Sequence, residues 1–131
     1  MSSEAAPGPR VVLVVDDEAR ILSALRRTLR REGYEILTAE TPAEALRILE
    51  ERAVDLILSD QKMPGMSGLE LLARAAERRP GAARLLITGW TEEVPQRQLE
   101  ELGVRALLPK PWDDGELKRT LRQALGRSHL A

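Results

Sequence analysis

Short apolar segments alternate with longer, more polar segments along most of the chain. The short segments are rich in β-branched residues and have the length of strands that are buried on both faces of a parallel sheet. We predict strands at residues 11–15, 35–39, 54–59, 84–87 and 105–108.

The longer segments repeat their apolar residues every three or four positions, which is the spacing of one helix face. In residues 18–32, the apolar side chains share one face and arginines cover the other. We predict helices at residues 18–32, 42–52, 67–79, 92–102 and 113–125.

Residues typical of helix ends support these boundaries. Thr41 precedes Pro42 as a predicted N-cap, and Glu44 follows at the position of a capping-box partner. Gly103 and Gly126 stand at the predicted ends of the last two helices. The helix assignments therefore agree with the end signals as well as with the periodicity.

Strands and helices alternate strictly in this prediction. Strict alternation with short connections favours a parallel sheet that is covered by helices on both faces. Five strands are too few for a TIM barrel, so we predict an α/β protein with a doubly wound sheet. In such sheets, functional residues collect at the carboxyl ends of the strands, near the switch in strand order.

The chain has the length and composition of one soluble, globular domain. It has 131 residues, of which 43% are hydrophobic and 31% are charged. We expect a flexible leader at residues 1–10, a compact domain at residues 11–126 and a tail at residues 127–131. The leader lacks the apolar run of a signal peptide, and no segment is long enough to span a membrane.

Composition also excludes several kinds of chemistry. The net charge of −1 gives no bulk attraction to nucleic acid or to anionic lipid. The absence of cysteine removes disulfides and thiol nucleophiles, and it fits a cytoplasmic protein. The single histidine, His129, argues against a zinc site or a histidine-based catalytic triad.

Polar side chains follow four of the five predicted strands. Asp16 and Asp17 follow the first strand, Asp60 follows the third, and Thr88 and Lys110 follow the fourth and fifth. A doubly wound sheet would bring the ends of these strands within side-chain reach of one another. The expected pocket therefore holds three carboxylates, one hydroxyl and one ammonium.

This set of groups suits phosphoryl transfer. Three carboxylates at close range repel one another, and a hard divalent cation such as Mg²⁺ resolves the repulsion. An ammonium from Lys110 and a hydroxyl from Thr88 suit the oxygens of a phosphoryl group in transfer. A carboxylate can act as the nucleophile by forming an acyl phosphate.

Each residue taken alone has an ordinary structural interpretation. Asp16 and Asp17 could cap the following helix, and Asp60 could be an acid before a turn. Thr88 could belong to a plain turn, and Lys110 could be a solvated surface lysine. The functional hypothesis depends on the joint pattern, because the polar groups at the ends of four strands form a chemically complete set.

Four motifs at these strand ends resemble those of the receiver domain of bacterial two-component response regulators. The motifs are VVDDE at Val14–Glu18, SDQKMPGMSG at Ser59–Gly68, ITGW at Ile87–Trp90 and LLPKPW at Leu107–Trp112. The resemblance extends from residue 11 to residue 125, and the four motifs together are highly specific. It implies a flavodoxin-like (βα)5 fold with strand order 2-1-3-4-5.

The resemblance implies a role for each site residue. Asp60 would be the phosphoacceptor. Asp17 would bind Mg²⁺ directly, Asp16 would act mainly through water, and the backbone carbonyl of Lys62 would supply a further ligand. Thr88 and Lys110 would contact the phosphoryl group.

The resemblance also implies a cis peptide bond between Lys110 and Pro111. The family usually carries Tyr or Phe at the position of Leu107, so the aromatic switch of the family is absent here and Leu107 is expected in the core. Trp90 is expected either to shield the phosphoryl group from water or form part of a partner surface, or to be a partly exposed aromatic on a loop. Trp112 is expected to pack at the start of the last helix.

The resemblance implies partners as well. A sensor histidine kinase or a histidine phosphotransfer protein would donate the phosphoryl group, and small donors such as acetyl phosphate could substitute. The chain would then be a phosphoacceptor signalling domain rather than a conventional enzyme, with Mg²⁺-dependent self-phosphorylation and slow dephosphorylation. Its output would pass to an unknown protein through the face of the fourth helix, fifth strand and fifth helix, which also allows a homodimer. Alternatively, the chain would relay the phosphoryl group to a histidine phosphotransfer protein. No direct nucleic-acid or membrane partner is expected.

Three other functions compete with a stand-alone receiver, which is the leading hypothesis because only five residues follow the predicted domain. The chain could be a fragment or a detached module of a hybrid kinase. It could be an aspartyl-phosphate phosphatase, but those enzymes need a second acid where Lys62 stands. It could be a pseudo-receiver that is never phosphorylated, against which the complete set of site residues argues.

Overall fold

The computed structural model describes residues 8–89 and 94–126, which form five strands and the helices between them. The strands are β1 (Val11–Val15), β2 (Glu35–Ala39), β3 (Leu56–Asp60), β4 (Ala83–Thr88) and β5 (Val104–Pro109). The helices are α1 (Ala19–Leu29), the 3-10 turn η2 (Arg30–Glu32), α2 (Pro42–Glu51), α3 (Gly68–Arg78), α4 (Gln96–Glu101) and α5 (Asp114–Gly126). Most of the predicted leader and all of the predicted tail lie outside the described residues, so those two boundaries stay predictions.

All five strands are parallel, and their order in the sheet is β2-β1-β3-β4-β5. The chain first moves outward from β1 to β2 and then crosses back to β3 on the other side of β1. This reversal is the switch point at which a doubly wound sheet places its functional residues. The predicted fold class and strand order are confirmed.

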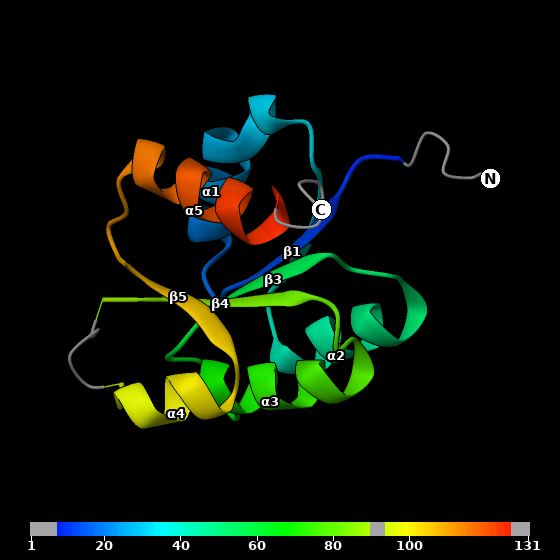
Figure 1. Ribbon diagram of the computed structural model, residues 1–131, viewed down its shortest axis with the longest axis vertical. Coiled ribbons are helices and arrows are strands. Elements are labelled where there is room, and N and C mark those ends of the chain that lie inside the picture. The colour runs from blue at the N-terminus through cyan, green and yellow to red at the C-terminus, as the bar shows by residue number, and fades with distance from the viewer. Residues whose placement is uncertain (1–7, 90–93, 127–131) are drawn as a thin grey trace.

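Helices cover both faces of the sheet (Figure 1), with α1 and α5 on one face and α2, α3 and α4 on the other. Alternate strand residues point to opposite faces, so each strand contributes to two separate cores. In β1, Val12 and Val14 pack with leucines of α1 and α5, whereas Leu13 and Val15 pack with residues of α2 and α3. This two-sided burial explains why the strands are almost continuously apolar.

The central strands end later than the sequence pattern suggested. β3 runs from Leu56 to Asp60 instead of residues 54–59, and β4 extends to Thr88. Asp60 lies opposite Ile87, and Thr88 lies opposite Pro109. Both polar residues therefore belong to the sheet itself, because ladder pairing continues past the apolar run that marked the predicted end.

The predicted helix at residues 92–102 was too long. Residues 92 and 93 lie outside the described residues, Val94 and Pro95 are not helical, and α4 begins at Gln96. Pro95 occupies the N-cap position with φ −65° and ψ 132°. A proline lacks the N–H of a helix interior, and it disfavours helical backbone in the residue before it, so the helix starts after Pro95.

The start of α3 lies tightly against the end of β3. Ser67 and Glu70 form a capping box, in which Ser67 Oγ accepts from the Glu70 amide at 3.2 Å and Glu70 Oε1 accepts from the Ser67 amide at 3.0 Å. Gly68 follows directly. A Cβ at this position would collide with the backbone carbonyl oxygen of Asp60 and lie 2.7 Å from Leu86 Cδ1. Glycine thus permits the close approach of α3 to the strand that carries Asp60.

This packing leads to a stability prediction. Gly68→Ala should lower the free energy of unfolding by about 1–3 kcal/mol, since neither the Asp60 carbonyl nor the packed Leu86 can move away freely. Urea unfolding followed by circular dichroism measures the change. Gly81→Ala is the control, because a Cβ there meets no atom within 4 Å and the unfolding midpoint should stay nearly constant. Equal midpoints for the two variants would contradict the close packing of α3 on β3.

Candidate functional site

Three carboxylates converge at the carboxyl edge of the sheet. Asp16 and Asp17 follow β1, and Asp60 ends β3, the strand beside it. One carboxylate oxygen from each of the three lies within 4.8 Å of the other two. Asp16 is fully buried and Asp60 is 5% exposed, while Asp17 faces solvent. The cluster is therefore half enclosed, with one open side.

Backbone contacts hold the two buried acids in place. The Asp16 amide donates to the Ala39 carbonyl of β2 at 3.1 Å, and Asp16 Oδ1 accepts from the Glu18 amide at 2.9 Å. Beyond Asp60, the Gln61 amide donates to Ile87 O of β4 at 3.2 Å. Strand β2 thus fixes the backbone of Asp16, and strand β4 fixes the backbone next to Asp60. The fold therefore holds the two acids close together.

Lys110 joins the two buried acids. Its Nζ lies 2.9 Å from Asp16 Oδ2 and 3.0 Å from Asp60 Oδ1, and its side chain is 19% exposed. Asp16 Oδ2 is buried, and the Lys110 ammonium is its ion-pair partner. The Lys110 amide donates to Thr88 O at 3.1 Å, which fixes the start of this side chain against β4.

The charges at the site do not balance. Three ionised carboxylates and one ammonium sum to −2. Burial raises the pKa of Asp60, the negative charges of Asp16 and Asp17 raise it further, and Lys110 only partly opposes them. Burial alone would lower the pKa of Lys110, but its contacts with Asp16 and Asp60 outweigh burial and raise it. The site therefore keeps its ammonium charged and lacks positive charge.

The donor set fits a hard divalent cation. The three side chains offer only carboxylate oxygens, which are the ligands that such cations prefer, and a charge of +2 would cancel the excess negative charge. The exposed position of Asp17 leaves room for water on the open side. The three carboxylates could thus hold such a cation, and the expected metal ligands Asp16, Asp17 and Asp60 stay a prediction.

The remaining predicted site residues lie at or near this edge. Thr88 is the last residue of β4 and is 1% exposed. Lys62 lies two residues beyond Asp60 and is exposed, and the role of its carbonyl stays a prediction. The Lys110–Pro111 bond is cis, as expected. Leu107 is partly buried against the core beside α3 and α4, while Trp90 lies outside the described residues.

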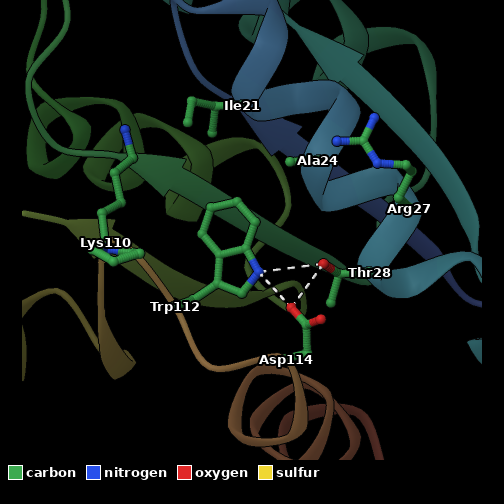
Figure 2. A pocket seen from close by; sticks show the side chains of 8 residues that line it. Ile21, Ala24, Arg27, Thr28, Lys110, Trp112 and Asp114 are labelled. Atoms are coloured by element: carbon green, nitrogen blue, oxygen red, sulfur yellow. Dashed lines mark hydrogen bonds between the residues drawn. The ribbon is translucent and has the colours of Figure 1, made fainter.

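Sequence reasoning missed two polar contacts around the site. Gln61 Oε1 accepts from the Leu69 amide at 3.0 Å and Gln61 O accepts from the Gly68 amide at 2.9 Å, so this residue ties the Asp60 loop to α3. Trp112 makes hydrogen bonds to residues of α1 and α5 (Figure 2). No local pattern predicts these contacts, because they depend on how the segments pack, and Thr28 lies 84 positions from Trp112.

A groove of about 680 Å³ borders Lys110 on the side of α1 (Figure 2). Its wall combines apolar and charged side chains from α1 and from the segment between β5 and α5. The lining residues are Ile21, Ala24, Arg27, Thr28, Lys110, Pro111, Trp112 and Asp114. Among the described residues, Lys110 is the one that this groove shares with the acid cluster, since Asp16, Asp17 and Asp60 are not among its lining residues.

Similarity to known proteins identifies the family of this chain. Residues 12–122 match the response regulator receiver domain family. The chain belongs to this family. The receiver resembles transcriptional regulatory proteins in its sequence. It is 43% identical over 115 residues to the hydrogenase transcriptional regulatory protein HoxA of Cupriavidus necator, and 35% identical over 120 residues to the transcriptional regulatory protein GlrR of Escherichia coli K12.

These alignments cover 87% and 92% of this chain but only 24% and 27% of the two relatives. The receiver thus spans about a quarter of the length of these two relatives. Among solved structures, a CheY-like receiver domain protein from Methanospirillum hungatei is 30% identical with a TM-score of 0.84, covering 93% of this chain and 98% of that one. The receiver domain of the hybrid histidine kinase CckA is 38% identical with a TM-score of 0.75, covering 88% of this chain and 98% of that one.

Phosphoryl acceptance is general to this family, and the comparisons identify no individual kinase or target for this receiver. A membrane-spanning helix would need to be longer and more apolar than any helix in the described residues.

The charge imbalance leads to a pH prediction for the metal-free receiver. Because the pKa of Asp60 is raised above its ordinary value of 3.8, ionised Asp60 costs folding free energy, and this cost appears as the pH rises through the raised pKa. Asp60→Asn should therefore be more stable than the wild type at pH 7 in EDTA, and the gain should disappear as the pH falls towards 4.

Urea unfolding at several pH values in EDTA measures this difference. Glu77→Gln is a matched control that removes one negative charge from the exposed side of α3. A gain for Asp60→Asn that persists unchanged at low pH, or an equal gain for Glu77→Gln, would contradict local repulsion at the site.

Proposed function

We propose that this receiver is a Mg²⁺-dependent phosphorylation switch in which Asp60 accepts a phosphoryl group from the phosphohistidine of a sensor histidine kinase or a histidine phosphotransfer protein. One observation carries the proposal. The ammonium of Lys110 lies 3.0 Å from Asp60 Oδ1 and 2.9 Å from Asp16 Oδ2, and one oxygen of each of Asp16, Asp17 and Asp60 lies within 4.8 Å of the other two. A phosphoryl group bound to Asp60 would meet positive charge from Lys110 and from a metal held by the acids.

The transfer is a displacement at phosphorus. An Asp60 carboxylate oxygen forms a bond to phosphorus, the bond between phosphorus and the donor histidine nitrogen breaks, and the electron pair leaves with the imidazole. The product is an acyl phosphate. Bound Mg²⁺ would supply charge neutralisation for the phosphoryl oxygens. Asp16, Asp17 and Asp60, with the Lys62 carbonyl, are the residues that would hold it.

The protein groups around Asp60 have separate tasks in this step. Lys110 places a fixed positive charge where phosphoryl oxygens gain negative charge, and the Thr88 hydroxyl can donate to another oxygen. Burial of Asp60 keeps its carboxylate poorly hydrated, so it reacts without first losing a full water shell. The receiver accepts the group once per cycle and then loses it slowly to water, which distinguishes it from a conventional enzyme.

The switch follows from competition for Lys110. Before transfer the ammonium contacts Asp16 and Asp60, and after transfer the phosphoryl oxygens offer more negative charge to the same group. A shift of Lys110 and Thr88 towards these oxygens would pull the ends of β5 and β4. We assign the readout of phosphorylation to the face of α4, β5 and α5. An unidentified target protein or a second copy of this chain would bind this face. We place the switch in the cytoplasm, without direct contact to nucleic acid or membrane.

The proposal predicts a phosphoryl adduct from a small donor. Incubation of the full chain with acetyl phosphate and Mg²⁺ should add one phosphoryl group, visible by intact mass spectrometry. The adduct should be absent in Asp60→Asn and in EDTA, because the nucleophile or the metal is then missing. Lys110→Met should slow its formation at least about tenfold.

Lys118→Met is the matched control for Lys110, since Lys118 lies on α5 and contributes to none of the site contacts described above. Its adduct should form at the wild-type rate. An adduct on Asp60→Asn would move the phosphoacceptor to another residue, and no adduct with acetyl phosphate or with a cognate kinase would support a pseudo-receiver instead.

The proposal also predicts stabilisation by the metal. Mg²⁺ should raise the free energy of unfolding by about 1.4 kcal/mol at ten times its dissociation constant, because it binds only the assembled acids. Urea unfolding with and without Mg²⁺ measures the gain. Asp17→Asn should lose most of it, whereas Glu77→Gln should keep it. An equal gain in Asp17→Asn would exclude Asp17 as a ligand.

A further inference from the structure

Three side chains from α1, from α5 and from the segment before α5 meet beside Lys110 (Figure 2). Trp112 Nε1 donates to Asp114 Oδ1 at 3.1 Å and to Thr28 Oγ1 at 3.3 Å, and Thr28 Oγ1 donates to Asp114 Oδ1 at 3.1 Å. Thr28 belongs to α1, Asp114 begins α5, and Trp112 lies between β5 and α5. We call these three residues the indole network.

The indole network closes a loop of contacts through the site. At one end, Lys110 Nζ contacts Asp16, which lies just before α1. At the other end, the network attaches Trp112 to Thr28 on the same helix. Only Pro111 separates Lys110 from Trp112. Helix α1 is rigid and therefore connects two points: Asp16, which contacts the Lys110 ammonium, and Thr28, which binds the Trp112 side chain.

Apolar packing alone would hold this segment less firmly. The Trp112 ring is only partly buried against the core of α1 and α5, and the 680 Å³ groove borders it. Side chains pack against the ring on one side but not on the groove side. Packing on one side alone does not determine the orientation of the Trp112 ring. The hydrogen bonds of its indole N–H fix this orientation.

We propose that the indole network is a positioning device for Lys110, holding the segment after β5 on α1 so that the ammonium reaches Asp60 and the incoming phosphoryl group. Trp112, Thr28 and Asp114 are positioning residues in this scheme, because they touch neither the acids nor the reacting phosphorus. The inference rests on the proposed function for its kinetic consequence, but the geometry that it explains is independent of phosphorylation.

Substitutions that remove single groups test the network. Trp112→Phe deletes the N–H and keeps an aromatic ring, and Thr28→Val replaces the hydroxyl by a methyl group of similar size. Each should slow adduct formation from acetyl phosphate about three- to tenfold, the range expected for losing one or two hydrogen bonds that orient a group in the reaction. Thr28→Ser restores the hydroxyl and should keep the rate within about twofold of the wild type.

Arg122→Gln is the matched structural control. Arg122 on α5 forms a bidentate ion pair with Glu32 at 2.7 and 2.9 Å, which fastens α5 to η2, the turn that follows α1. Neither Lys110 nor Trp112 takes part in this ion pair. Its loss should leave the rate of adduct formation unchanged. Equal slowing in Arg122→Gln and Trp112→Phe would reduce the network to a general structural contact and overturn the proposal.

A double-mutant cycle identifies the residue through which the network acts. If Trp112 acts by positioning Lys110, then Trp112→Phe causes no further slowing in a Lys110→Met background. Multiplied effects of the two substitutions would show that Trp112 acts independently of the ammonium and would overturn the proposal.

A measurement without phosphorylation keeps the two proposals separate. The ion pairs of Lys110 with two buried carboxylates should slow hydrogen exchange of its ammonium enough for a side-chain ¹⁵N–¹H NMR signal. This signal should weaken in Trp112→Phe and Thr28→Val and persist in Arg122→Gln. If the wild type forms no adduct, the proposed function fails, and the NMR signal alone tests the positioning role. A signal of equal strength in the wild type and in all three variants would overturn the positioning role.

Discussion

The structure depends on one ammonium shared between two buried carboxylates at the carboxyl edge of the sheet. Lys110 contacts Asp16 and Asp60 at 2.9 and 3.0 Å, and Asp17 adds a third negative charge nearby. One cation cannot balance three anions in a half-buried site, so the folded chain carries a local excess of negative charge. The same imbalance that costs stability favours a divalent cation, whose charge would balance that of the acids.

The fold supplies this arrangement through the ends of parallel strands. β1, β3, β4 and β5 deliver their polar residues to one edge, and contacts behind that edge keep them there. Gly68 lets α3 approach the backbone of Asp60, and Gln61 bonds that helix to the loop after β3. On the other face, the indole network joins α1 to the segment after Lys110. The contacts of Gly68 and Gln61 thus lie behind Asp60, and the indole network lies behind Lys110.

The predictable part of the site was the part encoded locally. Asp16, Asp60 and Lys110 could be found because each follows an apolar run, and parallel topology brings such ends together. The predicted start of α4 was wrong because Pro95 prevents helix formation at positions where the spacing of apolar residues indicated a helix. The bond between Trp112 and Thr28 could not be predicted, since the two residues are 84 positions apart and meet only when α1 packs beside α5. Long-range hydrogen bonds of this kind leave no local pattern.

The most direct test of the account is chemical trapping of the phosphorylated residue. Borohydride reduces an acyl phosphate of aspartate to homoserine, and peptide mapping then shows where the phosphoryl group was attached. After treatment with acetyl phosphate and Mg²⁺, the account predicts homoserine at position 60 and no conversion at positions 16 and 17. Homoserine at either of those two positions, or phosphorylated protein without any homoserine, would contradict the central claim that Asp60 is the phosphoacceptor.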